Sequence, residues 1–397
     1  MIKDVTDLYE VTRNFIHRVQ TPAYVVDEGL LIKNLEILKS VRERTGAKIL
    51  LAQKAFSMYA VYPLISQYLD GTTASGLYEA KLGHEEMGNR EVHVYAPAYR
   101  KEDVEQLVQI CDHIVFNTPK QWNKYKEIVK GADRKISCGI RINPGYAEVE
   151  TVLYNPCIPG SRLGSPLEQL SPEDLEGIEG LHFHTMCEQD ADVLWRTVQI
   201  VDEKFGAYLK QMKWINFGGG HHITKKGYKM DYLEKSIRLF QEKYGLTVYL
   251  EPGEAIALDA GFLVSEVLEV MENGKKIAIL DTSAACHMPD VLEMPYYPVI
   301  LQDNKVCLHV EKEMEQEYVY RLGGPTCLAG DVIGDYLFHQ KLEEGQRLVF
   351  CDMAIYSMVK NNTFNGMPLP AIYLYTKEGE LKLICEFHYE DFKKRLS

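Results

Sequence analysis

The chain lacks the long hydrophobic run of a membrane protein and the paired cysteines of a secreted one. No stretch reaches about 18 consecutive apolar residues, so no transmembrane helix is expected. Residues Met1 to Asp4 do not follow the basic-then-apolar order of a secretory signal. The nine cysteines are odd in number and widely spaced, which argues against a disulfide framework. Together these absences predict a cytoplasmic protein with reduced thiols.

Positive charge is also in short supply. The sequence has 44 Lys and Arg against 57 Asp and Glu, which gives a net charge of −13. This balance disfavours nucleic acids and anionic membranes as partners. It permits a cationic ligand, although acidity alone also serves solubility. We find no internal repeat and no low-complexity tract, so 397 residues predict two domains, or one large barrel with an appendage.

Short β-rich runs alternate with amphipathic stretches from about Tyr24 to Glu251. Eight such runs predict a (β/α)8 barrel, although an open doubly wound sheet could also use eight strands. Helix starts are expected at Thr118-Pro119 and at Ser171-Pro172, where a capping side chain precedes a proline. The eight runs are Lys48–Ala52, Gly71–Ala74, Val92–Tyr95, His113–Phe116, Ser137–Ile142, Gly180–His184, Trp214–Phe217 and Thr247–Leu250.

The pattern changes after about Ala260, where alternating segments follow one another with few helices between them. This predicts an all-β domain over 259–397, with 1–25 packed on it, and a barrel over 26–258. The segments are Gly261–Val270, Lys276–Asp281, Val306–Val310, Tyr318–Leu322, Arg347–Cys351, Ala371–Thr376 and Leu381–Glu386.

A long connection rich in Pro and Gly follows the fifth run, over Asn155 to Gly164. Loops of this length at the C-terminal end of a barrel strand are more often functional than decorative. We therefore expect this loop to contribute to the site.

Lys54 closes the first run and is the first candidate for chemistry. Desolvation at the end of a buried strand lowers the pKa of a lysine, which frees its amine to attack an aldehyde. For this residue alone, a lysine that reaches from a strand end toward water is the simpler interpretation.

Two later strand ends carry complementary groups. Gly218, Gly219 and Gly220 let backbone amides approach a phosphate closely, and barrels often bind phosphate near the seventh and eighth strands. Glu251 follows the eighth run, where a carboxylate could keep a pyridine nitrogen protonated. A flexible loop and a solvated glutamate are the simpler interpretations of each alone. With Lys54, these groups form the set that pyridoxal phosphate (PLP) requires.

His182 and His184 lie two residues apart and therefore share one face of the sixth strand. Such a pair also suits a metal, but that interpretation leaves Lys54 unexplained, and we predict no metal. We prefer His184 as the ring that stacks on the pyridine, with His182 in the core or behind it. Arg141 could steer the hydroxyl of the cofactor ring or pair with a structural carboxylate, and the sequence leaves both open.

Several fragments together resemble the fold-type III PLP decarboxylases, which include the ornithine and diaminopimelate decarboxylases. The resemblance covers nearly the whole chain, from Thr21-Pro22 to Asn365-Gly366. The fragments are Gln53-Lys54-Ala55, Leu181–His184, Phe217–Gly220, Glu251–Glu254, Gly323–Cys327 and Thr363–Gly366.

The resemblance implies a role for several residues. Lys54 would carry PLP, His184 would stack on its ring and Glu251 would face its nitrogen. Cys327 would reach the active site of a partner subunit, and Tyr356 would touch the phosphate. The family forms head-to-tail dimers with shared sites, so the resemblance implies a homodimer here.

One departure from the family pattern bears on the substrate. The family usually has Glu-Pro-Gly-Arg where this chain has Glu254 as the fourth residue, which exchanges a cation for an anion suited to an amine. Asp290, in an acidic run early in the β domain, and Asp331 are further candidates for substrate binding. These features resemble the branch that decarboxylates carboxynorspermidine or carboxyspermidine, whose substrates carry a polyamine tail. A surface role for Glu254 and Asp290 is the simpler alternative.

Two other activities and one non-catalytic role compete with this prediction. A diaminopimelate or other basic amino-acid decarboxylase is the nearest, but Glu254 disfavours a substrate with a distal carboxylate. An alanine racemase would need a catalytic tyrosine on the opposite ring face. A non-catalytic regulatory homologue could lose Lys54 or Cys327, and both are present.

Overall fold

The computed structural model describes residues 12–303, 305–311 and 316–397. The chain divides into two compact units by its internal contacts. Asn34–Ile256 form one unit, and the residues through Lys33 together with Ala257–Ser397 form the other. We call them the barrel unit and the sheet unit, and each is described by itself.

Eight parallel strands close into a barrel, each hydrogen-bonded to its neighbours in chain order, with the last strand beside the first. The closed barrel confirms the predicted (β/α)8 fold and excludes the open sheet. The strands are β2 (Lys48–Ala52), β3 (Gly71–Ala74), β4 (Glu91–Tyr95), β5 (His113–Phe116), β6 (Ser137–Arg141), β7 (Gly180–His182), β8 (Trp214–Asn216) and β9 (Thr247–Leu250).

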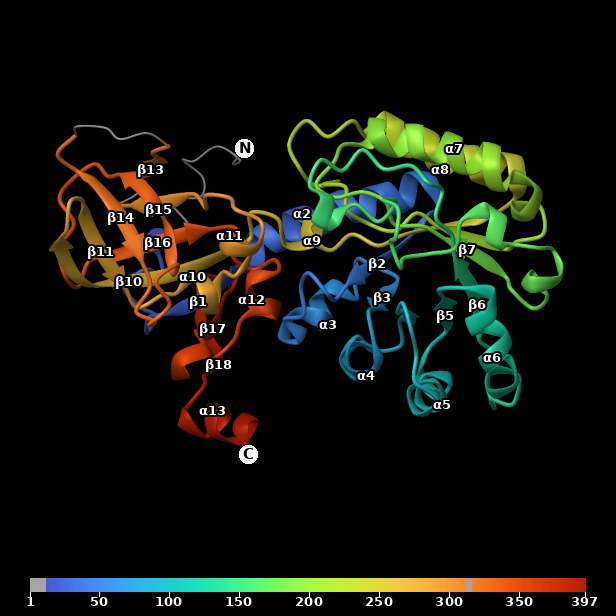
Figure 1. Cartoon of the computed structure of the whole chain (residues 1–397), viewed down its shortest axis with the longest axis horizontal. Helices are drawn as coiled ribbons and strands as arrows, with labels where there is room; N and C mark the ends of the chain where they lie inside the picture. The colour runs from blue at the N-terminus through green and yellow to red at the C-terminus, as the bar shows by residue number, and fades with distance from the viewer. Residues whose placement is uncertain (1–11, 304, 312–315) are drawn as a thin grey trace. The chain divides into compact units, whose positions relative to one another are not determined.

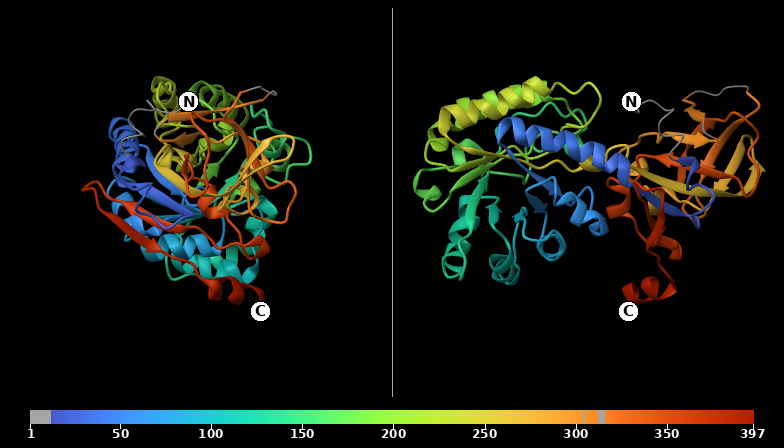
Figure 2. Two further views of the ribbon diagram at one scale, coloured as in Figure 1. Left: turned by 90° about the vertical axis from the view of Figure 1, so that its left-hand side faces the viewer. Right: turned by 180° about the vertical axis from the view of Figure 1, so that it is seen from behind.

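Helices surround the barrel strands, and Figures 1 and 2 show α7 and α8 side by side on its outside. The start of α6 is as predicted, because the Thr118 side chain accepts from Gln121 N–H at 3.1 Å and Pro119 follows it. The α-helices are α2 (Glu28–Thr45), α3 (Tyr62–Ile65), α4 (Leu77–Glu86), α5 (Lys101–Ile110), α6 (Pro119–Lys130), α7 (Ala191–Leu209), α8 (Met230–Tyr244) and α9 (Glu254–Ala257). Short 3₁₀ helices are η1 (Tyr59–Val61), η2 (Val152–Tyr154), η3 (Leu167–Gln169) and η4 (Glu173–Leu175).

The prediction of a helix after Ser171-Pro172 is wrong. Only the three residues of η4 form there, although Ser171 does accept from Asp174 N–H at 3.4 Å. Gly177 stops the turn, since its φ of 85° is left-handed and a Cβ there would lie 3.0 Å from the Trp122 ring. The chain therefore enters β7 directly, and the loop between β6 and β7 stays without an α-helix.

The N-terminal ends of the barrel strands enclose a polar cluster. One oxygen of Glu91 accepts a hydrogen bond from Tyr249 and lies 3.0 Å from the His93 ring, and its other oxygen pairs with Lys48. The rings of His93 and His113 stack with centroids 3.9 Å apart. Burial, helped by the charge on His93, lowers the pKa of His113 to about 2, so its ring stays neutral. The cluster therefore fills this end of the barrel with an ion pair, stacked rings and a partly buried carboxylate.

The sheet unit holds one ten-stranded sheet in the order β11-β14-β15-β13-β12-β16-β10-β1-β17-β18. Its strands are β1 (Ala23–Asp27), β10 (Gly261–Glu272), β11 (Lys276–Leu280), β12 (Ile300–Gln302), β13 (Lys305–His309), β14 (Val319–Gly323), β15 (Val332–Leu337), β16 (Arg347–Cys351), β17 (Ala371–Tyr375) and β18 (Leu381–Cys385). Short helices are α10 (Ala284–His287), α11 (Asp290–Glu293), α12 (Ser357–Lys360), η5 (Phe364–Gly366) and α13 (Tyr389–Leu396). The all-β character predicted for this part of the sequence is confirmed.

Three strands of this sheet were not singled out by the sequence pattern. β12 has only three residues, and β15 contains Gly334 and Asp335, two residue types that strands disfavour. β1 lies far along the chain from its partners, yet it pairs with β10 on one side and β17 on the other. These strands form because neighbours in space supply hydrogen bonds that local propensity does not reveal.

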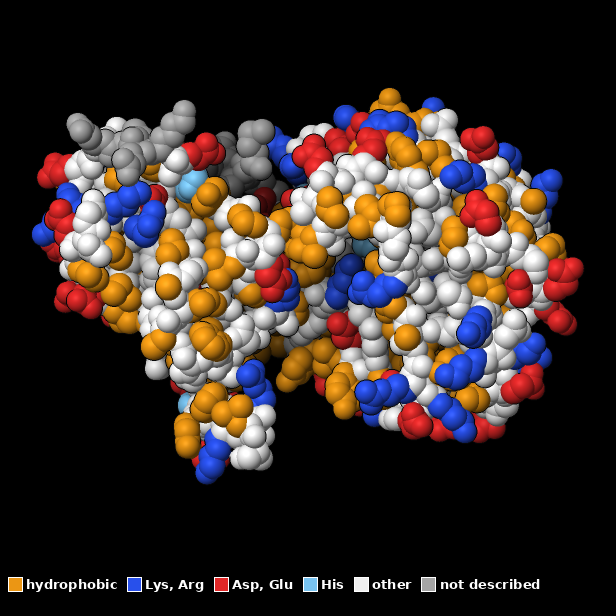
Figure 3. Space-filling view, viewed as in Figure 1, with side chains coloured by type: hydrophobic (Ala, Val, Ile, Leu, Met, Phe, Trp, Pro, Cys, Tyr) orange, Lys and Arg blue, Asp and Glu red, His pale blue; other side chains and the backbone are white. Residues whose placement is uncertain are grey.

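Two features of the surface bear on partners. Among the described residues, no helix combines the length and the apolar composition that crossing a bilayer requires. On the face shown in Figure 3, acidic and basic side chains are interspersed over the barrel unit.

Candidate active site

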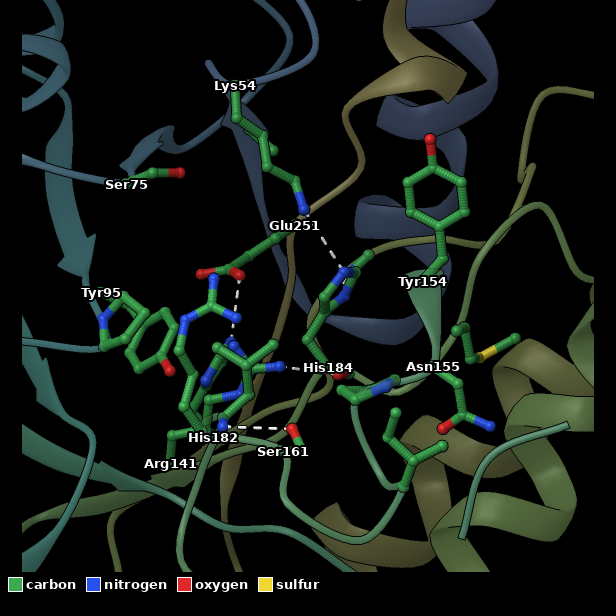
Figure 4. Close-up of a pocket in the computed structure, with 18 of the residues that line it drawn as sticks. Lys54, Ser75, Tyr95, Arg141, Tyr154, Asn155, Ser161, His182, His184 and Glu251 are labelled. Carbon is green, nitrogen blue, oxygen red and sulfur yellow. Dashed lines mark hydrogen bonds and ion pairs between the residues drawn. The ribbon is translucent and has the colours of Figure 1, made fainter. Parts of the chain in front are cut away.

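A cavity of about 580 Å³ opens at the C-terminal ends of the barrel strands (Figure 4). Groups from strand ends line it on one side, and the loop after β6 lines it on the other. This loop is the Pro- and Gly-rich connection singled out in the sequence. The polar and aromatic lining includes Lys54, Ser75, Tyr95, Arg141, Tyr154, Asn155, Ser161, Arg162, His182, His184 and Glu251.

Lys54 follows β2 and points its amine into this cavity. Its Nζ lies 3.4 Å from His184 Nε2, and among the described residues it has no ion pair. Although the side chain is exposed to the cavity, the surrounding protein restricts the water around the ammonium. Burial, and then the charge of Arg141, lowers the pKa of Lys54. The neutral form of the amine is therefore more populated than in an ordinary lysine. Nucleophilic attack requires this form.

His184 is oriented by two backbone contacts. Its Nδ1 accepts from Gly219 N–H at 3.0 Å, and its carbonyl accepts from the Arg141 guanidinium at 2.9 Å. Burial, and then the charge of Lys54, holds the pKa of His184 well below its usual range. The ring is thus neutral and carries its proton on Nε2, toward Lys54, because Nδ1 is an acceptor. A neutral ring fixed in this way suits the predicted stacking role.

Glu251 follows β9 and is an anion at neutral pH. Burial opposes its ionisation, but His182 and hydrogen bonds from Thr73 and Asn216 outweigh burial and lower its pKa to about 2. The His182 Nε2 lies 3.2 Å from one oxygen, and Asn216 donates to the other at 2.7 Å. His182 therefore holds the carboxylate, which agrees with a place behind the site. The fixed negative charge could keep a facing pyridine nitrogen protonated.

The three glycines are required by close backbone approach. A Cβ at Gly219 would lie 2.1 Å from the Glu251 carbonyl oxygen, and one at Gly220 would lie 1.9 Å from the Met186 carbonyl oxygen. Gly218 N–H donates to Asn216 and Gly219 N–H donates to His184, so two of the three amides already orient neighbouring groups. Among the described residues Gly220 N–H has no acceptor, which leaves this amide for a phosphate. Phosphate binding by these three glycines remains a prediction.

Arg141 ends β6 and lines the cavity. Its guanidinium lies 4.6 Å from the centroid of the Tyr95 ring and donates to the His184 carbonyl. Among the described residues no carboxylate pairs with Arg141, so the structural ion pair has no candidate partner. The cation instead lies beside Lys54 and faces the cavity.

Glu254 begins α9 and already has a partner. The His222 Nε2 lies 2.6 Å from its carboxylate, and both side chains are largely buried. Burial lowers the pKa of His222, but the hydrogen bond and charge of Glu254 outweigh this and raise it. An amine that binds Glu254 would therefore share it with His222.

The remaining predicted site residues lie in the sheet unit. Asp290 is ion-paired with Lys360. Asp331 is buried and accepts from Ser283 Oγ, Thr326 Oγ1 and Ala285 N–H. Cys327 is exposed, and Tyr356 has a left-handed φ of 55° directly before α12. Asp331 thus acts as a hydrogen-bond acceptor for three groups of the sheet unit.

The alternative of a metal on His182 and His184 finds no support from their contacts, because His182 holds Glu251 and His184 accepts from Gly219. Among the described residues, three ligand atoms within 4.8 Å of one another occur at Glu91, His93 and His113, at the other end of the barrel.

Sequence reasoning did not assign roles to several residues of the site. Asn216 and Thr73 hold Glu251, while Tyr95 lies under Arg141. The position of Asn216 at the end of β8 is the signal that could have revealed it, since polar residues at that end of a barrel strand face the site. Asn155 lies in the loop that the sequence predicted to contribute to the site, with Tyr154 directly before it, whereas Ser75 carries no comparable sequence signal.

The residues present fit PLP. The cavity brings together a lysine with a lowered pKa, an ionised buried carboxylate, a neutral imidazole and glycines that permit close backbone approach. Lys54 would hold the aldehyde carbon and Glu251 the pyridine nitrogen.

Comparisons with known proteins agree with this class of site. The family of pyridoxal-dependent decarboxylases, C-terminal sheet domain, matches residues 23–354. The chain therefore belongs to the PLP-dependent decarboxylase family and uses PLP as its cofactor.

Individual relatives are similar over nearly the whole chain. A carboxynorspermidine/carboxyspermidine decarboxylase of Campylobacter jejuni is 44% identical over 96% of this chain and 100% of its own. A carboxyaminopropylagmatine decarboxylase of Synechocystis is 42% identical over 95% of each chain. The crystal structure of carboxynorspermidine decarboxylase from C. jejuni, complexed with norspermidine, has a TM-score of 0.87 and 43% identity, and covers 95% of this chain and 100% of that one.

Proposed function

We propose that this protein decarboxylates carboxynorspermidine, carboxyspermidine or both, and releases norspermidine or spermidine in polyamine biosynthesis. The observation that carries the proposal is full-length similarity to enzymes with these substrates, at 44% identity, in a chain that retains Lys54 beside its cavity. PLP, when bound, supplies the electron sink for the pair of electrons that carbon dioxide leaves behind.

The chain's own residues bind the cofactor, orient it and control its protonation. Lys54 would hold the aldehyde carbon of the cofactor through its amine. Glu251, fixed by His182, keeps a proton on the pyridine nitrogen. His184 would support the ring, and Arg141 would donate to the ring hydroxyl. Tyr356 and the Gly218–Gly220 turn serve the phosphate.

Cys327, or alternatively Lys54, would donate a proton at Cα after carbon dioxide leaves. Because Cys327 and Lys54 belong to different units of the chain, we propose a homodimer in which each site takes its cysteine from the partner. Mixing inactive Lys54→Ala and Cys327→Ala proteins should restore up to about a quarter of the activity, since half of random dimers regain one intact site. No recovery after verified subunit exchange would place both residues of a site in one chain.

We propose that the polyamine tail is recognised by acidic side chains, with Glu254, Asp290 and Asp331 as candidates. A charge-assisted hydrogen bond contributes roughly 1.5–3 kcal/mol, so Glu254→Gln or Asp290→Asn should cost about ten- to a hundredfold in kcat/KM. Because Glu254 also holds His222, the affinity for PLP should be measured alongside. A loss confined to long substrates supports tail binding, whereas weaker PLP binding with all substrates assigns Glu254 to the cofactor. Glu91→Gln, another histidine-paired glutamate, is the matched control.

The experiment that tests the function is product analysis with four substrates at equal concentration. These are carboxynorspermidine, carboxyspermidine, carboxyaminopropylagmatine and diaminopimelate. The first two differ by one methylene, which is worth only about 1 kcal/mol, so both should be turned over. Preference for carboxyaminopropylagmatine would assign the second candidate function, which the 42% identity to the Synechocystis relative favours. Preference for diaminopimelate would overturn the proposal.

We also propose a cytoplasmic location. All nine cysteines are free, including five that are buried, as expected in a reducing compartment. Fractionation of native cells with an antibody against the chain would test this directly.

A further inference from the structure

The turn of η5 carries a contact that the proposed function has not used. The Cys327 N–H donates to Asn365 Oδ1 at 2.8 Å, which joins two segments 38 residues apart in the sequence. Both segments belong to the sheet unit. The Phe-Asn-Gly sequence at 364–366 is one of the fragments that carried the family resemblance, and no role followed for its asparagine.

Cys327 depends on its backbone for its position. Its side chain is exposed, so packing does not fix the direction of the thiol. On one side the preceding Thr326 donates to the buried Asp331 at 2.6 Å, and on the other Cys327 itself donates to Asn365. Two hydrogen bonds from adjacent residues thus hold the loop that carries the thiol.

The turn that presents Asn365 is itself anchored. Asn362 donates to the Ala285 carbonyl at 2.8 Å and its N–H donates to the Cys286 carbonyl at 2.9 Å. Its own side-chain oxygen accepts from Phe364 N–H at 3.0 Å. Asn365 takes a left-handed φ of 58°, a conformation that asparagine and glycine tolerate better than other residues. The turn therefore offers a fixed acceptor to a loop that is otherwise exposed.

We propose that Asn365 is a positioning residue for Cys327, which it holds by its backbone so that the thiol can protonate Cα. This inference rests on the proposed function. In that step the bond from Cα to the carboxylate breaks, carbon dioxide leaves, and the electron pair returns to Cα. The Cys327 S–H bond breaks as the new C–H bond forms, and the thiolate regains a proton from water. There is no net oxidation or reduction.

Two variants of Asn365 separate the hydrogen bond from the backbone conformation. Asn365→Gly keeps the left-handed turn and removes the acceptor, whereas Asn365→Asp keeps both. With the PLP-loaded enzyme and carboxynorspermidine, Asn365→Gly should lower kcat roughly three- to tenfold with KM little changed, the range expected for one hydrogen bond. Asn365→Asp should return kcat to within about twofold of the wild type.

A second measurement does not depend on turnover. Hydrogen–deuterium exchange of the peptide that contains Cys327 should be faster in Asn365→Gly and unchanged in Asn365→Asp. Equal exchange and equal kcat in Asn365→Gly would overturn the positioning role. Cys327→Ala, measured in parallel, tests the proposed function separately: full activity in that variant would remove Cys327 from the chemistry, while exchange would still report whether Asn365 holds its loop.

Discussion

The two ends of the barrel carry the same residue types in different states. At the N-terminal ends of the strands, Glu91 meets His93 and Lys48, and at the C-terminal ends Glu251 meets His182 with Lys54 nearby. Both carboxylates have a pKa of about 2 because histidine and hydrogen bonds outweigh burial. The lysines differ, since Lys48 is paired with its carboxylate and Lys54 is beside a neutral imidazole and a cavity.

This difference shows what separates a structural cluster from a reactive one. Lys48 is held in an ion pair with Glu91, which occupies its amine. Lys54 is desolvated and has Arg141 as a neighbouring cation, and both lower its pKa. The open volume beside it then admits a reaction partner. Substitutions at the two ends of the barrel should therefore have different effects.

The largest effect should come from the two lysines. Lys54→Ala should abolish covalent attachment of PLP and lower kcat/KM by about 10³-fold or more, because the nucleophile is lost. Lys48→Met should keep the covalent attachment of PLP and the wild-type kcat/KM, and should lower only the stability of the protein. Borohydride reduction followed by peptide mass analysis reports the attachment. A reducible adduct in Lys54→Ala would move the attachment to another lysine and remove the contrast.

The two glutamates should differ next. Glu251→Gln replaces a fixed anion by a neutral amide, so the pyridine nitrogen loses its proton and kcat should fall on the order of 10²-fold. Glu91→Gln should leave kcat unchanged. Steady-state kinetics at saturating PLP decide this, and similar kcat values for the two variants would show that the Glu251 charge does not serve the reaction.

Arg141 tests the same contrast through its effect on the pKa of Lys54. Its charge lowers the Lys54 pKa, so Arg141→Met should raise that pKa and move the amine toward its protonated form. The rate at which apoenzyme attaches PLP should then reach its midpoint at a higher pH than in the wild type. Rapid-mixing absorbance across a pH series measures this, and an unchanged midpoint would assign the shift to burial alone.

The smallest effect is on stability in acid. Glu91 has its pKa lowered from 4.5 to about 2, so its contribution is present above pH 4.5 and is lost as the pH falls toward 2. Glu91→Gln should therefore show a shallower decline in Tm over this window, and be less stable by roughly 1–3 kcal/mol near neutral pH. Thermal unfolding between pH 2 and pH 7 provides the measurement. A decline as steep as that of the wild type would show that Glu91 is not paired in solution.

The local hydrophobic pattern predicted the barrel, because parallel strands that are buried on both faces appear in the sequence as short apolar runs. The strand-end residues Lys54, His184 and Glu251 followed from the barrel rule, since strand ends of one polarity meet at one edge. The strand β1 did not follow, because its hydrogen-bond partners are distant in sequence. The strands β12 and β15 did not follow, because β12 has only three residues and β15 contains Gly334 and Asp335. The helix expected after Ser171 failed because Gly177 takes a left-handed conformation that no local signal demanded.

The sequence by itself determined the fold class, the cofactor and the residue types that serve it. Only the tertiary structure decided which charges are already paired. Glu254 and Asp290 have protein partners in His222 and Lys360, Glu251 owes its ionisation to His182, and Lys54 has no carboxylate partner among the described residues. The physical reason is that a pKa and a charge balance depend on distances of a few ångströms between residues far apart in the chain, and these distances are fixed only when the chain folds.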